Sequence, residues 1–141
     1  MCASPFEAND EIIFLDTETV IAIHEEALIE GGLAGILNLS ALESALHRPQ
    51  NAFDYEGCKN LIRLASVLWH GVSSAHAFCD ANKRTALLTC LAFLEVNGLE
   101  LHSSVHEDEA GNFIECAYKT NTFEIPLLEE FLRVRLVWIE V

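Results

Sequence analysis

The stretch that decides the fold of this 141-residue chain covers residues 76–98 and reads HAFCDANKRTALLTCLAFLEVNG. Its first part carries a histidine, a carboxylate, an amide and two adjacent cations, and the rest is almost wholly apolar. The long apolar run predicts a buried helix from about Asn82 to Asn97, with Gly98 as its left-handed stop. We therefore expect a polar loop that leads directly into the central helix of the fold.

The two adjacent cations are unusual in a chain this acidic, which has 8 Lys and Arg against 22 Asp and Glu and a formal net charge of −14. Cations in the first turn of a helix oppose its dipole, at a cost of about 0.3–1 kcal/mol each unless an anion is present. The first amides of a helix are unpaired and bind anions, so Lys83 and Arg84 predict a phosphate site. Asp80 is placed just before this helix, where it could hold a divalent cation beside the phosphate.

The composition also argues against several classes of protein. A charge of −14 disfavours direct contact with nucleic acid or with an anionic membrane. The longest apolar run, residues 86–96, is shorter than the roughly 20 residues of a membrane span. Five cysteines without a CxxC pair suit a reducing cytoplasm. We expect a cytoplasmic chain with residues 1–10 as a loosely ordered N-terminal arm and residues 11–141 as a single domain.

Helical periodicity dominates the rest of the chain. The expected helices begin after the N-cap Asp16, at the capping box Ser40–Glu43, near Glu56, near Glu107 and at Pro126. Gly111 weakens the prediction for the helix that starts near Glu107. Pro49 is expected to end the second helix, so that residues 48–55 form a loop. Because strand-like alternation is missing, we predict an all-α, compact bundle of about six helices with a central buried helix after the motif loop.

Several chemical interpretations of the polar loop remain open from the residues alone. His76 could accept a proton from an incoming hydroxyl beside the phosphate, since phosphoryl transfer needs mainly positioning and charge neutralisation. Asp80 or Asn82 could instead cap the helix. His76 and Cys79 could belong to a zinc site, although structural zinc normally needs four ligands. A nucleophilic Cys79 is less favoured, because His76 already has a role in the first interpretation.

Residues 76–85 resemble the signature of the Fic superfamily, and more specifically that of the death-on-curing (Doc) toxins of type II toxin–antitoxin modules. Residues 23–32, 42–50 and 94–98 agree with the same family, and the resemblance covers roughly residues 18–135. It implies a Fic/Doc-like helical bundle. It also implies that residues 48–55 correspond in position to the family's flap over the active-site mouth, although a surface loop without function is an alternative.

The resemblance implies a role for each residue that matches the motif. His76 is expected to be the base that activates a target hydroxyl, and Asp80 to hold magnesium against the nucleotide phosphates. Asn82, Lys83 and the loop amides would line the anion site, and Arg84 would contact phosphate oxygens as a second catalytic residue. A buried aromatic residue, Phe78, would anchor the loop. The other histidines are interpreted as structural, since the sequence identifies no partner for them (His24, His47, His70, His102 and His106).

Two departures from the general Fic pattern indicate which reaction to expect. Fic adenylyltransferases carry Gly where this chain has Lys83, and a second Arg where it has Leu87. A lysine there should crowd the anion site and obstruct the nucleotide pose used for AMP transfer. Doc-type proteins share this lysine, so the resemblance implies a protein Ser/Thr kinase that uses ATP and Mg²⁺. Fic-type AMP transfer, or a catalytically weak binding module, are the alternatives.

The resemblance also implies partners. The expected protein substrate is a translation factor like elongation factor Tu, whose phosphorylation arrests translation. The expected inhibitor is a Phd-like antitoxin whose C-terminal segment docks in a hydrophobic groove of the toxin. Toxin and antitoxin together repress their operon, with the DNA contacts supplied by the antitoxin. The acidic composition of this chain agrees with its having no direct nucleic acid contact.

Overall fold

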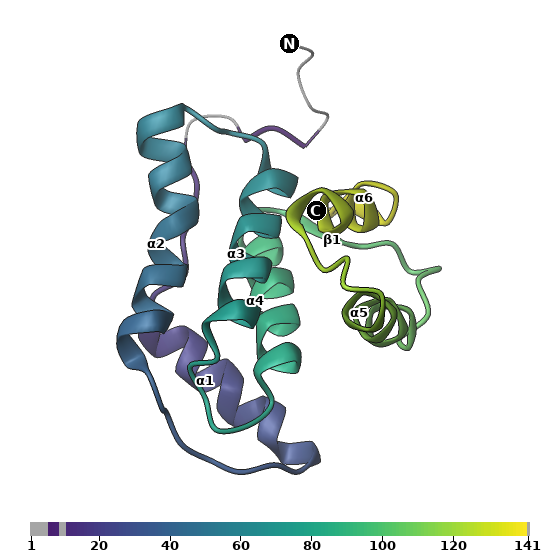
Figure 1. The fold of residues 1–141 in the computed structure, drawn as a ribbon. Helices are drawn as coiled ribbons and strands as arrows, with labels where there is room; N and C mark the ends of the chain where they lie inside the picture. Colours follow the sequence, from purple (N-terminus) through teal and green to yellow (C-terminus); the bar gives the residue numbers. More distant parts are fainter. Residues whose placement is uncertain (1–5, 9–10, 141) are drawn as a thin grey trace.

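A computed structural model describes residues 6–8 and 11–140, and Figure 1 shows its fold. The described residues form six α-helices, one 3₁₀ turn (η1) and two short strands. Their bounds are α1 Thr17–Ala27, η1 Leu28–Glu30, α2 Leu39–Glu56, α3 Leu61–Ala75, α4 Asn82–Val96, β1 Leu99–Leu101, α5 Glu109–Lys119, α6 Ile125–Arg133 and β2 Leu136–Trp138. The predicted helical class is confirmed.

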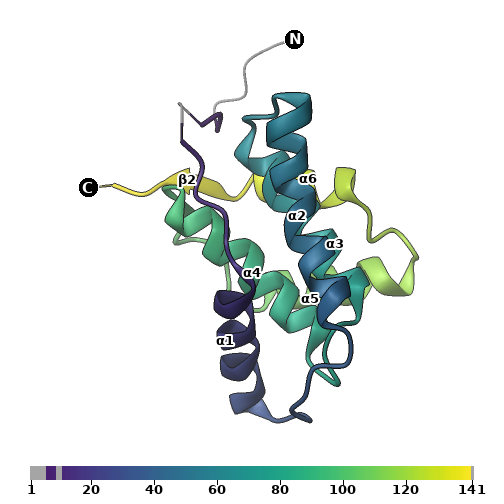
Figure 2. The same ribbon diagram turned by 90° about the vertical axis from the view of Figure 1, so that its left-hand side faces the viewer.

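Helices α3 and α4 form the centre of the molecule. Figures 1 and 2 show α2 beside α3, α1 against α4, and α5 with α6 on the side of α3 away from α2. The apolar run predicted to be the central helix is α4, whose buried residues include Ala86, Cys90 and Phe93. The tight packing of α3 against α4 fixes the loop between them, which is the polar loop of the sequence motif.

The core is built on the apolar face of α3. The apolar residues that recur with a helical period along α3 are all buried: Leu61, Leu64, Ala65, Leu68 and Trp69. Trp69 is fully buried, and its ring lies 5.9 Å from Phe113 of α5 and 5.9 Å from Phe131 of α6. These aromatic contacts attach the C-terminal helices to the central layer.

Helix α2 differs from the sequence prediction in where it begins and where it ends. It begins one residue after Asn38, whose side chain accepts a hydrogen bond from the Ala41 amide at 3.0 Å, so the proposed capping box is not the start. It then continues through Pro49 to Glu56, so residues 48–55 are helical and neither a loop nor a flap. A proline inside a helix removes one hydrogen bond. Here Pro49 is itself buried, and the face that α2 packs against α3 compensates for that loss.

The end of α2 and the start of α3 also differ from the prediction. Gly57 ends α2 in the left-handed conformation, at φ 68°. Asn60 then caps α3, and its side chain accepts hydrogen bonds from the amides of Ile62 and Arg63 at 3.0 and 3.2 Å. The helix expected near Glu56 therefore begins at Leu61. By contrast, Asp16 caps α1 as predicted, with its side chain bonded to the Thr19 amide at 2.8 Å.

The C-terminal third contains a short strand pair, and its first strand lies in residues 99–103, a connection that the sequence allows to be extended. Strands β1 and β2 run antiparallel, with Leu99 opposite Trp138 and Leu101 opposite Leu136. Each has three residues, which is too short for an alternating pattern to show. Helix α5 continues without a break through Gly111. The last helix, α6, ends at Arg133, and Val134, which follows it, is 65% exposed although its apolar spacing in the sequence suits the inner face of that helix.

The described part of the expected N-terminal arm is attached to the connection between α2 and α3. The carbonyl of Phe6 accepts a hydrogen bond from the Leu61 amide at 3.1 Å, and the Ala8 amide donates to the Lys59 carbonyl at 2.8 Å. Residues 1–5, 9 and 10 lie outside the described residues, so the arm and the single-domain boundary stay predictions. In the described chain, no helix is both long enough and apolar enough to cross a membrane.

Candidate active site

The polar loop reverses the chain between α3 and α4. His76 is the C-cap of α3 at φ 48°, and Ala81 precedes α4 at φ 61°. Positive φ is uncommon for residues other than glycine, and such residues cluster where function fixes the backbone. The two left-handed residues turn the chain so that the end of α3 and the first turn of α4 line the same pocket.

The inner side of the loop is fixed by Phe78 and Asn82. Phe78 is 2% exposed. Asn82 accepts a hydrogen bond from the Phe78 amide at 3.1 Å and donates one to the Phe78 carbonyl at 2.9 Å. The Asn82 side chain therefore closes the loop on itself, and it does not cap α4. Its predicted part in phosphate binding stays a prediction.

Helix α1 contributes His24, whose contact with the motif loop the sequence did not indicate. His24 is buried, and its ring stacks on Phe78 with 3.9 Å between centroids and 10° between planes. Its Nε2 donates a hydrogen bond to the Asp80 carbonyl at 3.0 Å. The histidine was expected to be structural without an identified partner, and its partner is the motif loop. The signal that could have found it is its place on the apolar stripe of α1, where a buried polar group needs a partner.

The Asp80 carboxylate is exposed on the loop. It accepts hydrogen bonds from the Ala81 amide at 2.8 Å and from the Leu33 amide at 3.3 Å. These backbone bonds, with a smaller effect from Arg84, hold the pKa of Asp80 below its usual range. Asp80 is thus ionised at neutral pH. The residue just before α4 is Ala81, so Asp80 is not the helix cap that the sequence allowed.

Residues 32–38 lie along the outside of the motif loop. The Cys79 amide donates to the Gly35 carbonyl at 3.1 Å, and the Leu37 amide donates to the Ala77 carbonyl at 2.7 Å. At Gly32, φ is 130° and a Cβ atom would come within 3.0 Å of an Asp80 carboxylate oxygen. Glycine lets the backbone pass this close to the carboxylate. This segment, rather than residues 48–55, flanks the motif.

The two predicted cations leave the first turn of α4 in different directions. Arg84 Nη1 donates a hydrogen bond to the carbonyl of Ala27, at the end of α1. Lys83 Nζ lies 4.0 Å from the centre of the Tyr118 ring of α5, a cation–π contact. Tyr118 in turn shares a hydrogen bond with Ser73 of α3. The cations therefore connect the motif to α1 on one side and to α5 on the other.

One pocket of about 630 Å³ brings the predicted site residues together. That volume lies in the range of small-molecule sites, roughly 300–1,000 Å³. The residues that line it come from the end of α3, the loop, α4 and α5: Ser73, His76, Cys79, Asp80, Ala81, Asn82, Lys83, Arg84, Leu87, Gly111, Ile114, Glu115 and Tyr118. His76 and Arg84 therefore face one cavity. The α5 side was missed, because nothing in the local pattern of residues 109–119 relates them to the motif.

The donor set suits magnesium better than zinc. Within the described residues, no group of three or more His, Cys, Asp or Glu side chains could hold a metal ion, so the zinc alternative is not supported. Proteins commonly hold Mg²⁺ with one or two carboxylates, while phosphates and water supply the remaining ligands. The exposed, ionised Asp80 carboxylate at the pocket fits that arrangement.

Residues 14–94, more than half of the chain, match the Fic/DOC family. The chain therefore belongs to the Fic/DOC family. Among its relatives is the protein kinase doc of Escherichia phage P1, 33% identical over 91 residues, which are 64% of this chain and 72% of the relative. Another is the toxin Doc of Mycolicibacterium smegmatis, 31% identical over 98 residues, 69% of this chain and 74% of the relative. The predicted resemblance to Doc toxins is confirmed.

Proposed function

We propose that this chain is a Doc-type toxin that acts in the cytoplasm as a protein Ser/Thr kinase. It transfers the terminal phosphate of Mg-ATP to a hydroxyl of a translation factor like elongation factor Tu, and so arrests translation. The observation that carries the proposal is the single pocket that holds a potential base, a carboxylate and two cations at the head of one helix: His76, Asp80, Lys83 and Arg84. The name of the phage relative as a protein kinase supports the same reaction class.

In this proposal His76 is the general base. Its side chain is exposed at the pocket, where an acceptor hydroxyl can reach it. The imidazole takes the hydroxyl proton as the oxygen forms a bond to the terminal phosphorus. The bond from that phosphorus to the bridging oxygen breaks, and ADP leaves with the electron pair. A positioned base of this kind contributes about 10²–10⁴-fold to rate.

The first turn of α4 neutralises the phosphate charge. The amides at a helix start point toward a bound anion, and Lys83 and Arg84 add full positive charges to the same pocket. The contact of Arg84 with the Ala27 carbonyl holds the guanidinium near this turn before substrate binds. Asp80 would hold the magnesium ion, which supplies further charge neutralisation when bound.

Two side chains favour phosphoryl transfer over AMP transfer. Lys83 stands where Fic adenylyltransferases carry glycine, and its ammonium extends across the pocket to Tyr118. Leu87, in place of a second Arg, leaves the next turn of α4 without a charge for a further phosphate. Both differences support a nucleotide that presents its terminal phosphate to the motif.

Labelled ATP tests the reaction. The purified chain, elongation factor Tu and Mg²⁺ should give labelled protein from γ-labelled ATP and not from α-labelled ATP. His76→Ala should lower the rate about 10²–10⁴-fold, and Arg84→Ala about 10²–10³-fold. His47→Ala is the matched control, because His47 is exposed on α2 and does not line the pocket. Label that arrives only from α-labelled ATP would establish AMP transfer instead.

A Phd-like antitoxin is the proposed partner. Exposed apolar residues lie on the segment that is bonded to the motif loop, including Leu33 at 71% and Leu37 at 70% exposure. A segment bound over them would also cover Asp80, because Leu33 is bonded to its carboxylate. Expression of the chain alone should stop growth, and co-expression of a small antitoxin-like neighbouring gene should restore it. Arrest that persists in His76→Ala would instead support a binding module.

A further inference from the structure

Lys83 is held by an aromatic ring and not by a carboxylate. Its Nζ lies 4.0 Å from the centre of the Tyr118 ring, and in the described part of the chain it forms no ion pair. The chain has 22 Asp and Glu against 8 Lys and Arg, so a carboxylate partner would be easy to supply. Glu115 of α5 even lines the same pocket, but it pairs with Lys119 at 3.6 Å. The positive charge of Lys83 is therefore left without a neutralising partner.

An aromatic ring restrains an ammonium group differently from a carboxylate. The ring attracts the cation through the negative face of its π system, and it adds no formal charge to the pocket. An ammonium group has three N–H donors, so a phosphate oxygen can bind Lys83 on the side away from the Tyr118 ring. A carboxylate in that position would compete with the phosphate for the same cation. The ring can therefore hold the lysine side chain and still leave its charge to an anion.

The Tyr118 ring is itself held by the core. Its hydroxyl shares a hydrogen bond with the buried Ser73 of α3. Its ring stacks on Phe123, with 4.6 Å between centroids and 23° between planes. Phe123 in turn contacts the fully buried Trp69 in a T-shaped arrangement at 6.0 Å. Tyr118 thus has contacts that fix both its hydroxyl and its ring plane.

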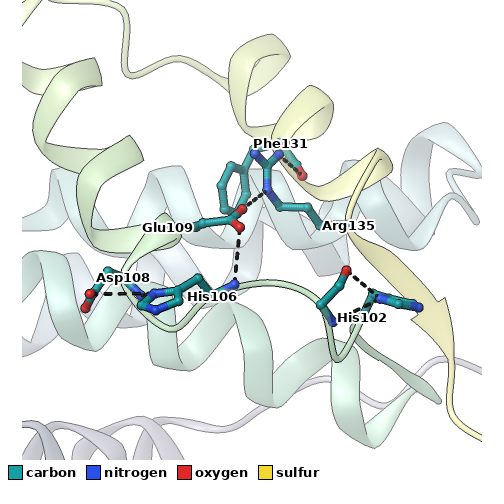
Figure 3. Close-up of polar contacts among 7 residues, drawn as sticks. His102, His106, Asp108, Glu109, Phe131 and Arg135 are labelled. Carbon is teal, nitrogen blue, oxygen red and sulfur yellow. Dashed lines mark hydrogen bonds and ion pairs between the residues drawn. The ribbon is translucent and has the colours of Figure 1, made fainter.

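Helix α5, which carries Tyr118, is attached at its first turn to the residues around the end of α6 (Figure 3). Arg135 Nε donates to one Glu109 carboxylate oxygen at 3.0 Å, and the His106 amide donates to the other at 3.2 Å. Arg135 Nη1 also donates to the Phe131 carbonyl at 3.1 Å. The hydrogen bond from Arg135 holds the pKa of Glu109 below its usual range, so this carboxylate is ionised at neutral pH. These bonds support the helix that places Tyr118 beside the motif.

We propose that Tyr118 is a positioning residue, which holds the Lys83 ammonium where a phosphate group binds. The inference rests on the proposed function, in which phosphate lies at the start of α4. A free lysine side chain samples many rotamers and must lose that freedom when it binds an anion. The contact with Tyr118 removes part of that freedom beforehand, so phosphate binding costs less entropy.

Calorimetric titration with Mg-bound inorganic tripolyphosphate tests this role in a double-mutant cycle. Tyr118→Leu removes the ring and should weaken binding about two- to fivefold, the effect of an exposed cation–π contact. In a Lys83→Met background the same substitution should have no effect, because the ammonium is gone. Arg84 still binds the anion in that background, so the affinity stays measurable. Tyr118→Phe keeps the ring and should retain most of the wild-type affinity.

A fluorination series separates the cation–π contact from packing. Tyr118→Phe is prepared with an increasing number of fluorine atoms on the ring, which weaken its negative face and largely keep its shape. Affinity for tripolyphosphate should fall with each added fluorine in the chain with Lys83, and should stay constant in Lys83→Met. The series also decides the role if circular dichroism shows that Tyr118→Leu does not fold.

The outcomes are separable from those of the kinase assay. An equal loss of affinity on Tyr118→Leu in both backgrounds overturns the positioning role, because the ring would then act through packing. Affinity that does not change along the fluorine series overturns it too. If the expected coupling is found but γ-labelled ATP gives no labelled protein, the role of Tyr118 stands and the proposed reaction fails. A wild-type chain that binds no tripolyphosphate overturns the role of Tyr118, whatever the labelling assay shows.

Discussion

His24 shows how one buried side chain joins an outlying helix to the site. No residue of α1 lines the pocket, yet His24 stacks on Phe78 and hydrogen-bonds the Asp80 carbonyl. Asp80, whose backbone is held in this way, is one of the residues that line the pocket. His24 therefore acts as a positioning residue for Asp80.

Replacing His24 tests that role. His24→Ala removes a stacking partner and leaves the Asp80 carbonyl without its donor, which should lower the free energy of unfolding by about 1–3 kcal/mol. It should also raise the Mg²⁺ concentration needed for half-maximal ATP binding. His24→Gln keeps a donor and should retain part of both properties. Denaturant titration and calorimetry measure them, and an alanine variant with wild-type values for both would contradict the role.

Because the pKa of His70 is lowered in the folded chain, we expect the free energy of unfolding to depend on pH. Burial, with a smaller effect from Arg48, lowers the pKa of the His70 imidazole, whose ring stacks on Phe123. The unfolded chain then binds a proton at a higher pH than the folded chain does. Stability should therefore be full above about pH 6.5, the ordinary imidazole value, and should fall as the pH drops through and below it.

Denaturant titration at several pH values checks this prediction. His70→Gln should flatten the dependence between about pH 7.5 and pH 5.5, the window in which an unfolded imidazole gains its proton. The exposed His102 supplies the control, and His102→Gln should leave the slope as in the wild type. An unchanged slope in His70→Gln would assign the pH dependence to other groups.

At the scale of elements, the packing of α2 on α3 governs the fold around the site. Pro49 lies inside α2 and is buried, although the sequence predicted that it would end the helix. Farther along the interface, Gly71 of α3 lies against Ala45, and a Cβ atom on Gly71 would be 3.4 Å from the Ala45 Cβ. The two helices are therefore in close contact, and that contact holds α2 together through its proline.

Two substitutions of Gly71 test this contact. Gly71→Ala would place its methyl group at an ordinary van der Waals distance from Ala45, so stability should change little. Gly71→Leu would force the helices apart and should cost about 1–3 kcal/mol, the usual penalty of overpacking. Denaturant titration measures the two variants side by side. A leucine variant as stable as the alanine variant would show that α2 can move away freely.

At the scale of the whole molecule, the excess of acidic residues sets the electrostatic background. A net charge of −14 destabilises the compact chain through self-repulsion, which salt screens. The midpoint of thermal unfolding should therefore rise as NaCl is increased from about 10 to about 150 mM, where the screening length falls to about 8 Å. Differential scanning calorimetry measures this, and a midpoint that falls with salt would show that favourable ion pairs dominate.

The candidate active site forms only when several elements of the folded chain come together. Its loop joins α3 and α4, α1 holds the loop through His24, residues 32–38 flank it, and α5 supplies the far wall. The match to the Fic/DOC family covers residues 14–94, which include the motif and α1 to most of α4. The α5 wall lies beyond that match, where the chain can differ in the shape of its pocket.

The sequence by itself determined the features that depend on neighbours along the chain. These are the apolar periods of α3 and α4, the cap Asp16, and a loop that places His76, Asp80, Lys83 and Arg84 within nine positions. The helical period and the length of the loop set the positions of these residues along the chain. A local sequence pattern is therefore enough to predict them.

The tertiary structure alone decided the features that depend on distant contacts. His24 and Asp80 are 56 positions apart, α2 continues through Pro49 because it packs on α3, and Gly111 faces the motif from another helix. The free energy for each comes from burial and hydrogen bonds between segments that meet only when the chain folds. Local propensity is weak beside these contacts, so it could not predict them.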